Sequence, residues 1–196
     1  MKTSKSAQLT PRQFALGALA LLGLLLAGCV TTSIYPFYTE KDVVFDPKLV
    51  GRWSGKPEDT NEFWSFERDR TNAAYLLRIV EGQKDNKYWV HLFKLKQWTF
   101  IDAQVMADCE GMVSPHYLAK VVRMEPTLEL QLMNHKWLEA YLEEHPRALR
   151  HIRKPGEYSS DLVLTADTAE LQKFLLKHAN DTNLFTENLT PMVRTK

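Results

Sequence analysis

Short apolar segments separated by Gly, Asn and Asp turns dominate the chain between residues 50 and 133. They predict strands at 52–54, 62–68, 73–81, 87–95, 98–104, 117–124 and 127–133. In the last of these, Leu128, Leu130 and Leu132 alternate with Glu129 and Gln131, which predicts one buried face and one solvated face. Strands joined in this way by short turns favour an antiparallel sheet.

Two amphipathic helices are predicted after these strands. Asn134 can cap a helix that ends before Pro146, and Asp167 with Glu170 three residues later forms a capping-box pattern at the start of a second helix. Their apolar stripes contain Trp137, Leu138, Tyr141 and Leu142 in the first helix and Leu171, Phe174 and Leu175 in the second. Strands followed by helices predict an α+β fold in which the two C-terminal helices pack on the sheet and fill the space that it leaves.

The first 28 residues have the pattern of a signal peptide. Lys2, Lys5 and Arg12 give a basic start, and the run 14–26 contains only Leu, Ala, Gly and Phe. This run is shorter than the ~18 residues that cross a bilayer, but it suits the apolar core of a signal peptide.

The apolar run ends in Leu26-Ala27-Gly28-Cys29, and here the sequence resembles bacterial lipoprotein precursors that are processed by signal peptidase II at a lipobox. The resemblance implies recognition of Leu26, Ala27 and Gly28, cleavage before Cys29, and a diacylglycerol and an N-acyl chain on that cysteine. Chains of this kind hold a protein stably on a membrane. An aspartate after the cysteine commonly retains such lipoproteins at the inner membrane. Val30 in that position implies the outer membrane, facing the periplasm.

These patterns divide the chain into four parts. We expect a lipoprotein signal peptide at 1–28, the lipidated cysteine and a tether at 29–46, one globular α+β domain at 47–185, and a flexible tail at 186–196. Residues 35–38 of the tether read Tyr-Pro-Phe-Tyr, and aromatic side chains of this kind favour docking on the domain, since a solvated linker is polar.

Charge and cysteine content exclude some classes of function. The chain has 25 basic and 24 acidic side chains, and removal of the three basic residues of the signal peptide leaves it near neutral. It therefore lacks the basic field of a nucleic-acid-binding protein. Cys109 has no intramolecular partner once Cys29 carries lipid, so the domain has to fold without a disulfide.

The segment Gly51-Arg52-Trp53 resembles the Gly-x-Trp opening of the first lipocalin strand, which makes Gly51 and Trp53 candidates for a barrel plug or for lining a ligand site. The lipocalin Thr-Asp-Tyr signature is absent, and the helix signals after Asn134 occupy chain that a full eight-stranded barrel would use. We therefore expect a sheet that is only partly barrel-like. The mature part is also similar to uncharacterised bacterial lipoproteins that share a Leu-Val-Gly-x-Trp start.

Candidate chemical groups lie close together only at Asp108, Cys109, Glu110 and His116. Their spacing matches no metal motif, and a nucleophilic cysteine needs a base placed in space, so a loop with a partly buried thiol is the simpler interpretation. His135, His145 and His151 have charged neighbours and are interpreted as surface residues. We therefore predict no metal, no catalytic group and no cofactor other than the lipid on Cys29.

Three functions are compatible with the sequence. The preferred one is a lipid-anchored, non-catalytic interaction or binding module of the cell envelope, with the membrane and another envelope protein as partners. The second is a lipocalin-like carrier of a small apolar ligand. The third is an envelope hydrolase, which only Cys109 and His116 support.

Overall fold

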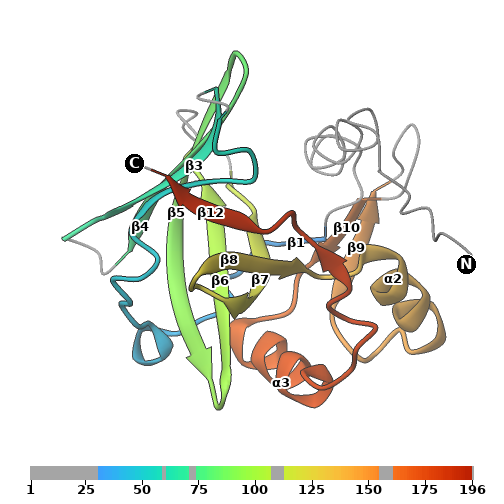
Figure 1. Ribbon diagram of the computed structural model, residues 1–196. Coiled ribbons are helices and arrows are strands. Elements are labelled where there is room, and N and C mark those ends of the chain that lie inside the picture. Colours follow the sequence, from blue (N-terminus) through green and yellow to red (C-terminus); the bar gives the residue numbers. More distant parts are fainter. Residues whose placement is uncertain (1–30, 59–60, 71–73, 107–112, 155–160, 196) are drawn as a thin grey trace, which may run out of the picture.

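The computed structural model describes residues 31–58, 61–70, 74–106, 113–154 and 161–195. In these residues a mostly antiparallel barrel stands beside two helices (Figure 1). The barrel strands follow one another along the chain as β2 (Gly51–Ser54), β3 (Glu62–Arg68), β4 (Tyr75–Glu81), β5 (Lys84–Leu95), β6 (Trp98–Val105), β7 (His116–Arg123) and β8 (Thr127–Leu132). The alternating apolar pattern thus predicted these seven strands to within a few residues.

The C-terminal strand β12 (Met192–Thr195) closes the barrel. It pairs on one side with β8, through Met192 and Leu128, and on the other side with β2, through Val193 and Ser54. Together with the pairing of β7 with β8, this makes a closed ring of eight described strands. The expectation of a sheet that closes only in part is therefore wrong, because the last residues of the chain supply the strand that the helices seemed to leave out.

The flexible tail expected at 186–196 is corrected by the same observation. Strand β11 (Glu187–Asn188) pairs with β8, and β12 completes the barrel a few residues later. The segment has little periodicity of its own, since two residues of β11 and four of β12 are too few to show a pattern. Pairing with strands far away in the sequence decides its structure.

Alternate residues of the barrel strands point into the barrel and form one apolar cluster. Its largest members are 0–1% exposed: Trp53, Phe66, Tyr75, Leu92 and Leu128. Since a side chain beside an open space would show exposed surface, these residues fill the part of the interior in which they lie.

A second layer lies on the outer face of the barrel. The sheet continues from β7 through β1 (Thr32–Ser33), β10 (Asp161–Leu164) and β9 (His151–Lys154). Helices α2 (His135–Glu144) and α3 (Thr168–His178) lie beside these strands (Figure 1). A second apolar cluster joins the outer side chains Phe93, Phe100 and Leu118 to residues of both helices, among them Leu138, Leu142, Leu171, Phe174 and Leu175.

The helix starts agree with the sequence, but the expected place of the helix side chains does not. Asn134 accepts a hydrogen bond from the backbone of Trp137, and Asp167 accepts one from the backbone of Glu170. The apolar stripes were expected to fill the space that the sheet leaves. Instead the barrel interior contains side chains of its own strands, and the helix residues belong to the outer cluster.

The expected tether lies along the domain from Thr31 onward. Strand β1 pairs with β7 and β10, Phe37 is 1% exposed, and the short 3-10 helix η1 (Glu40–Asp42) follows. The backbone N–H of Val44 then donates to the carbonyl of Leu92 in β5. Phe37 and Tyr38 therefore pack on the domain, with Phe37 in the outer cluster, whereas Tyr35 is 46% exposed.

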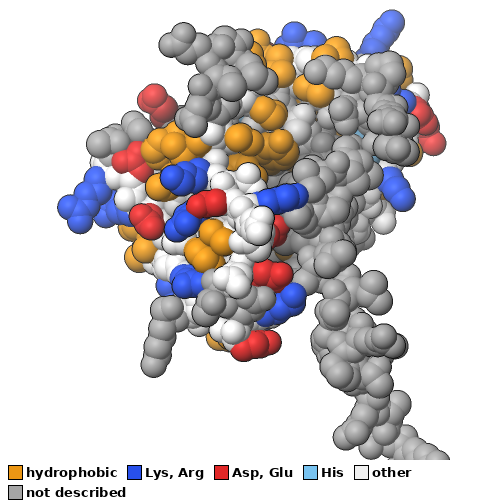
Figure 2. Space-filling model, turned by 90° about the horizontal axis from the view of Figure 1, so that it is seen from above, with side chains coloured by type: hydrophobic (Ala, Val, Ile, Leu, Met, Phe, Trp, Pro, Cys, Tyr) orange, Lys and Arg blue, Asp and Glu red, His pale blue; other side chains and the backbone are white. Residues whose placement is uncertain are grey.

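The surface has charges of both signs. Figure 2, which looks at the molecule from above, shows Lys and Arg side chains interspersed with Asp and Glu, and apolar side chains gathered between them. This agrees with the near-neutral net charge of the chain. Within the described ranges, no helix combines the length and the apolar character needed to cross a bilayer.

Candidate functional site

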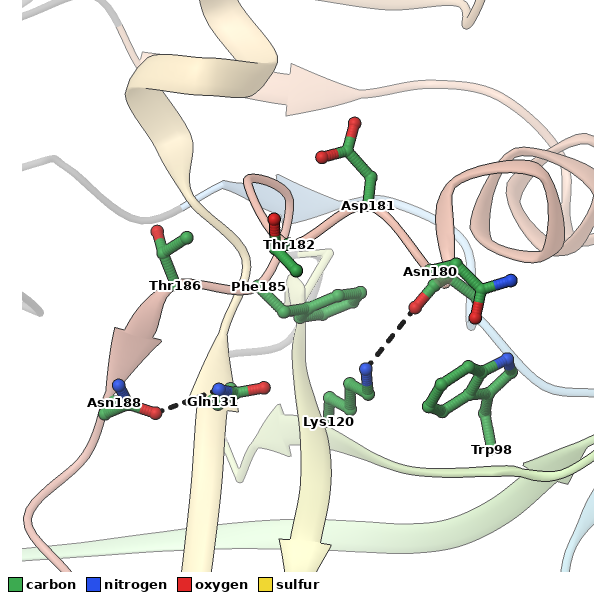
Figure 3. A pocket seen from close by; sticks show the side chains of 10 residues that line it. Trp98, Lys120, Gln131, Asn180, Asp181, Thr182, Phe185, Thr186 and Asn188 are labelled. Carbon is green, nitrogen blue, oxygen red and sulfur yellow. Dashed lines mark hydrogen bonds between the residues drawn. The ribbon is translucent and has the colours of Figure 1, made fainter.

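A groove of about 400 Å³ lies on the outer face of the barrel, where β6, β7 and β8 meet the segment that follows α3 (Figure 3). The strands contribute one side chain each: Trp98 from β6, Lys120 from β7 and Gln131 from β8. The other side of the groove is made by residues 179–182, 185, 186 and 188.

Strand alternation brings these three side chains to the outer face. Lys120 stands opposite Phe100 and Gln131 in the sheet. Of its two neighbours in the strand, Ala119 belongs to the interior cluster and Val121 packs against it. Gln131 lies between Leu130 and Leu132 on the face that the sequence predicted to be solvated. Since successive side chains of a strand point to opposite faces, an apolar interior and a polar outer groove arise from the same strands.

Lys120 is the central charge of the groove. Its Nζ lies 4.0 Å from the ring centroid of Trp98 and 5.5 Å from that of Phe185, and it donates a 3.4 Å hydrogen bond to the carbonyl of Ala179 (Figure 3). Burial lowers the pKa of the Lys120 amine. Among the described residues no carboxylate forms an ion pair with it, so the ring faces and one carbonyl are its partners there.

The rim of the groove is polar. The side-chain amide of Gln131 donates to the Asn188 side chain at 2.9 Å, which fixes both groups (Figure 3). Asn180 and Thr182 are exposed on the opposite rim, and Asp181 accepts a hydrogen bond from the backbone of Asn183. A cation that forms no ion pair with the described residues, a tryptophan ring and a rim of amides and hydroxyls can together hold a small polar ligand that has an anionic group.

A second polar cluster is enclosed between the barrel and the N-terminal segment. Asp102 on β6 is 1% exposed, accepts a 2.9 Å hydrogen bond from the backbone of Phe37, and lies 2.7 Å from Nδ1 of His116 on β7. In the neighbouring strand the ring of His91 stacks on Tyr38 with centroids 4.3 Å apart. Through the contacts of Phe37 with Asp102 and of Tyr38 with His91, the N-terminal segment packs on the barrel.

The titration of this cluster follows from its enclosure. Burial, and to a smaller extent the charge of Asp102, raises the pKa of Tyr38 to about 12. Burial also lowers the pKa of His91 below its usual 6.5, although Asp102 acts in the opposite direction. The cluster therefore favours a neutral His91 beside a buried acid.

Gly51 and Trp53 lie in β2, and Trp53 belongs to the interior cluster. Trp53 is 0% exposed, its indole N–H donates to the carbonyl of Leu49 at 2.9 Å, and the guanidinium of Arg194 lies over its ring, 4.4 Å from the centroid. Arg194 also donates to the carbonyls of Lys48 and Val50. Gly51 has a φ of +133°, a backbone conformation that residues with a side chain rarely adopt, so this position favours glycine.

Several residues singled out in the sequence lie outside the described ranges, namely Leu26 to Cys29 and Asp108 to Glu110. His116 is described and lies against Asp102. The interpretation of His135 as a surface residue is wrong: it is 3% exposed, and its Nδ1 lies 3.2 Å from the hydroxyl of Thr31. Neither Thr31 nor Asp102 was singled out in the sequence, because each contact joins segments far apart in the chain.

The sequence did contain a signal for the groove. Lys120 is a cation in the middle of the apolar strand 117–124, and Trp98 begins the strand before it. Their approach to residues 179–188 depends on tertiary structure. Among the described residues no group of three or more His, Cys, Asp or Glu side chains is arranged to hold a metal ion. No protein-family model, curated protein or solved structure matches this chain.

Proposed function

We propose that this protein is a lipid-anchored, non-catalytic binding module of the cell envelope, held through Cys29 at the outer membrane and facing the periplasm. The sequence Leu26-Ala27-Gly28-Cys29 after a basic start and a short apolar run supports the anchor. The groove around Lys120 supports the binding role.

The environment of Lys120 is the observation on which the binding role depends. A partly buried ammonium to which the described part of the chain offers no carboxylate favours an incoming anion, because a charge-assisted hydrogen bond would offset its desolvation. Trp98 offers a ring for stacking, and the amide and hydroxyl rim suits hydroxyl groups. The ligand class that combines these features is a small acidic carbohydrate or a compound of similar polarity.

Transport of an apolar ligand inside the barrel is the second candidate. The closed ring of eight strands favours it, since barrels of this size can hold one small ligand. The fully buried Trp53, Phe66, Tyr75, Leu92 and Leu128 argue against it, since they occupy interior space that a ligand would need. We therefore place the ligand in the outer groove. Under this proposal, Asp102 and His116 hold the N-terminal segment on the barrel and have no catalytic role. Hydrolysis is therefore the least favoured of the three candidate functions.

The anchor is tested by Cys29→Ser in the native host. Because lipidation needs the thiol, this variant should take up no radioactive palmitate. The membrane fraction should contain none of its shortened, mature form. The Cys109→Ser variant is the matched control and should be labelled like the wild type. Palmitate labelling of the Cys29→Ser protein would contradict the proposal.

The binding role is tested with the delipidated domain, residues 30–196. Glucuronate, glucose and palmitate are titrated separately while tryptophan fluorescence is recorded. Glucuronate should give saturable quenching through Trp98, glucose should bind more weakly because it lacks the carboxylate, and palmitate should give none. A one-to-one palmitate complex would make the carrier the leading function.

A further inference from the structure

We infer that the described domain lies directly on the membrane surface, with the face around Thr31 and the start of α2 against the phospholipid headgroups. The inference rests on the proposed lipid anchor at Cys29. It gives the docked N-terminal segment a defined orientation relative to the membrane.

The domain begins two residues after the proposed anchor. Thr31 is 4% exposed and hydrogen-bonded to His135, and Thr32 and Ser33 form β1 between β7 and β10. At ~3.3–3.6 Å per residue, the Cα atoms of Cys29 and Thr31 are at most ~7 Å apart. A diacylglycerol on Cys29 would therefore emerge at the surface of the domain itself.

A bilayer leaves little space for the domain to stand away from it. The headgroup regions add ~5–8 Å on each side of a ~30 Å hydrocarbon core. The acyl chains must enter the hydrocarbon core, and the two-residue link is no longer than the headgroup layer is thick. The link therefore lies within that layer. The domain surface beside Thr31 then has to touch that layer.

Thr31 and His135 are themselves buried, and the exposed residues next to them and to β1 are Lys136 and Arg153, which we call the anchored face. His135 is the first residue of α2, and Lys136 beside it is exposed. Arg153 on β9 pairs with Leu162 of β10, and its guanidinium donates to Glu143 and to the carbonyl of Glu139 in α2. The face therefore combines exposed side chains of α2 and β9.

The groove adjoins the anchored face. The side-chain amide of Asn134, directly before His135, donates to the hydroxyl of Thr186, which lines the groove. One rim of the groove is thus linked to the anchored face through adjacent residues.

The orientation is tested on lipidated full-length mature protein in vesicles of phosphatidylethanolamine and phosphatidylglycerol that contain a nitroxide-headgroup lipid. In a Cys109→Ser background, a fluorophore is attached at Lys136→Cys on the anchored face or, as the matched control, at Lys87→Cys on the exposed part of β5. The label at 136 should be quenched, and the label at 87 should not. Insertion of about twenty Gly and Ser residues between Val30 and Thr31, which gives a flexible reach of ~25 Å, should abolish the quenching at 136.

The outcomes separate the anchor from the orientation. Equal quenching at both positions in palmitate-labelled protein would overturn the orientation and leave the anchor intact, and so would quenching at 136 that survives the insertion. Wild-type protein that incorporates no palmitate would overturn both the anchor and the orientation. Equal urea midpoints of the labelled variants would show that the labels do not disturb the fold.

Discussion

The interior of the barrel and the outer face of the same strands differ sharply in chemistry. On β5, β6 and β7, the residues Leu92, Ile101 and Ala119 belong to the apolar interior cluster, while the outer positions include Asp102 and Lys120. The two faces alternate residue by residue. Because the interior is apolar and its largest side chains are fully buried, we assign it to stability, and we assign the polar positions of the outer face to attachment and binding.

The largest effect is expected from the interior. Trp53→Ala would remove a fully buried indole, its hydrogen bond to Leu49 and the ring on which Arg194 stacks. Large-to-small changes of this kind destabilise by ~3–5 kcal/mol. Urea unfolding should show that loss, while Trp98→Ala on the outer face should lose much less stability. Equal losses of unfolding free energy in Trp53→Ala and Trp98→Ala would contradict the assignment of stability to the interior.

The buried acid on the outer face should have the next largest effect. Asp102→Ala would leave the Phe37 N–H and His116 without their acceptor, and buried groups left unpaired in this way cost about 1–3 kcal/mol each. The total loss of unfolding free energy for the two groups should therefore be about 2–6 kcal/mol. Hydrogen exchange should show faster exchange at Phe37, with the interior strands unchanged. Faster hydrogen exchange throughout the interior strands would mean that the two faces unfold as one cooperative unit.

Lys120 separates binding from stability. Lys120→Gln should change the unfolding free energy by less than about 1 kcal/mol, because the amine is partly exposed and removal of its charge also removes its desolvation. Affinity for glucuronate should fall roughly ten- to hundredfold, since a charge-assisted hydrogen bond contributes ~1.5–3 kcal/mol. Calorimetric titration measures the change, with Lys87→Gln as the control that should leave affinity unchanged.

The pH dependence of this binding follows from the pKa of Lys120. Because burial lowers that pKa below 10.5, the ammonium loses its proton at a lower pH than an exposed lysine does. Affinity for the anion should therefore weaken as the pH rises through the lowered pKa. Affinity that stays constant up to pH 10.5 would argue that Lys120 does not contact the ligand.

The smallest expected effect concerns His91. Its folded-state pKa is below 6.5, so on acidification the unfolded state binds a proton first, and stability is lost as the pH falls below about 6.5. His178, whose pKa burial also lowers, contributes in the same direction. His91→Phe keeps the stacking partner of Tyr38 and should flatten the dependence of unfolding free energy on pH between 6.5 and 5. An unchanged slope would assign the acid sensitivity to other groups.

The sequence alone predicted the local elements well. The strands 62–68, 98–104 and 127–133 and both helix starts depend on alternation and on capping side chains, which are short-range signals. It also contains the linear patterns that resemble a signal peptide and a lipobox, on which the proposed anchor depends. These features need no knowledge of where the chain returns in space.

Only the tertiary structure decided how the barrel closes and where the polar sites lie. Strand β12 is four residues long and pairs with β2, more than 130 residues earlier, so no local periodicity marks it. The contacts of Thr31 with His135, of Phe37 with Asp102 and of Lys120 with Ala179 span 104, 65 and 59 residues. The sequence determined which residues alternate and where helices begin. Folding decided which distant segments share an edge, because hydrogen bonding and burial between them depend on closure of the whole sheet.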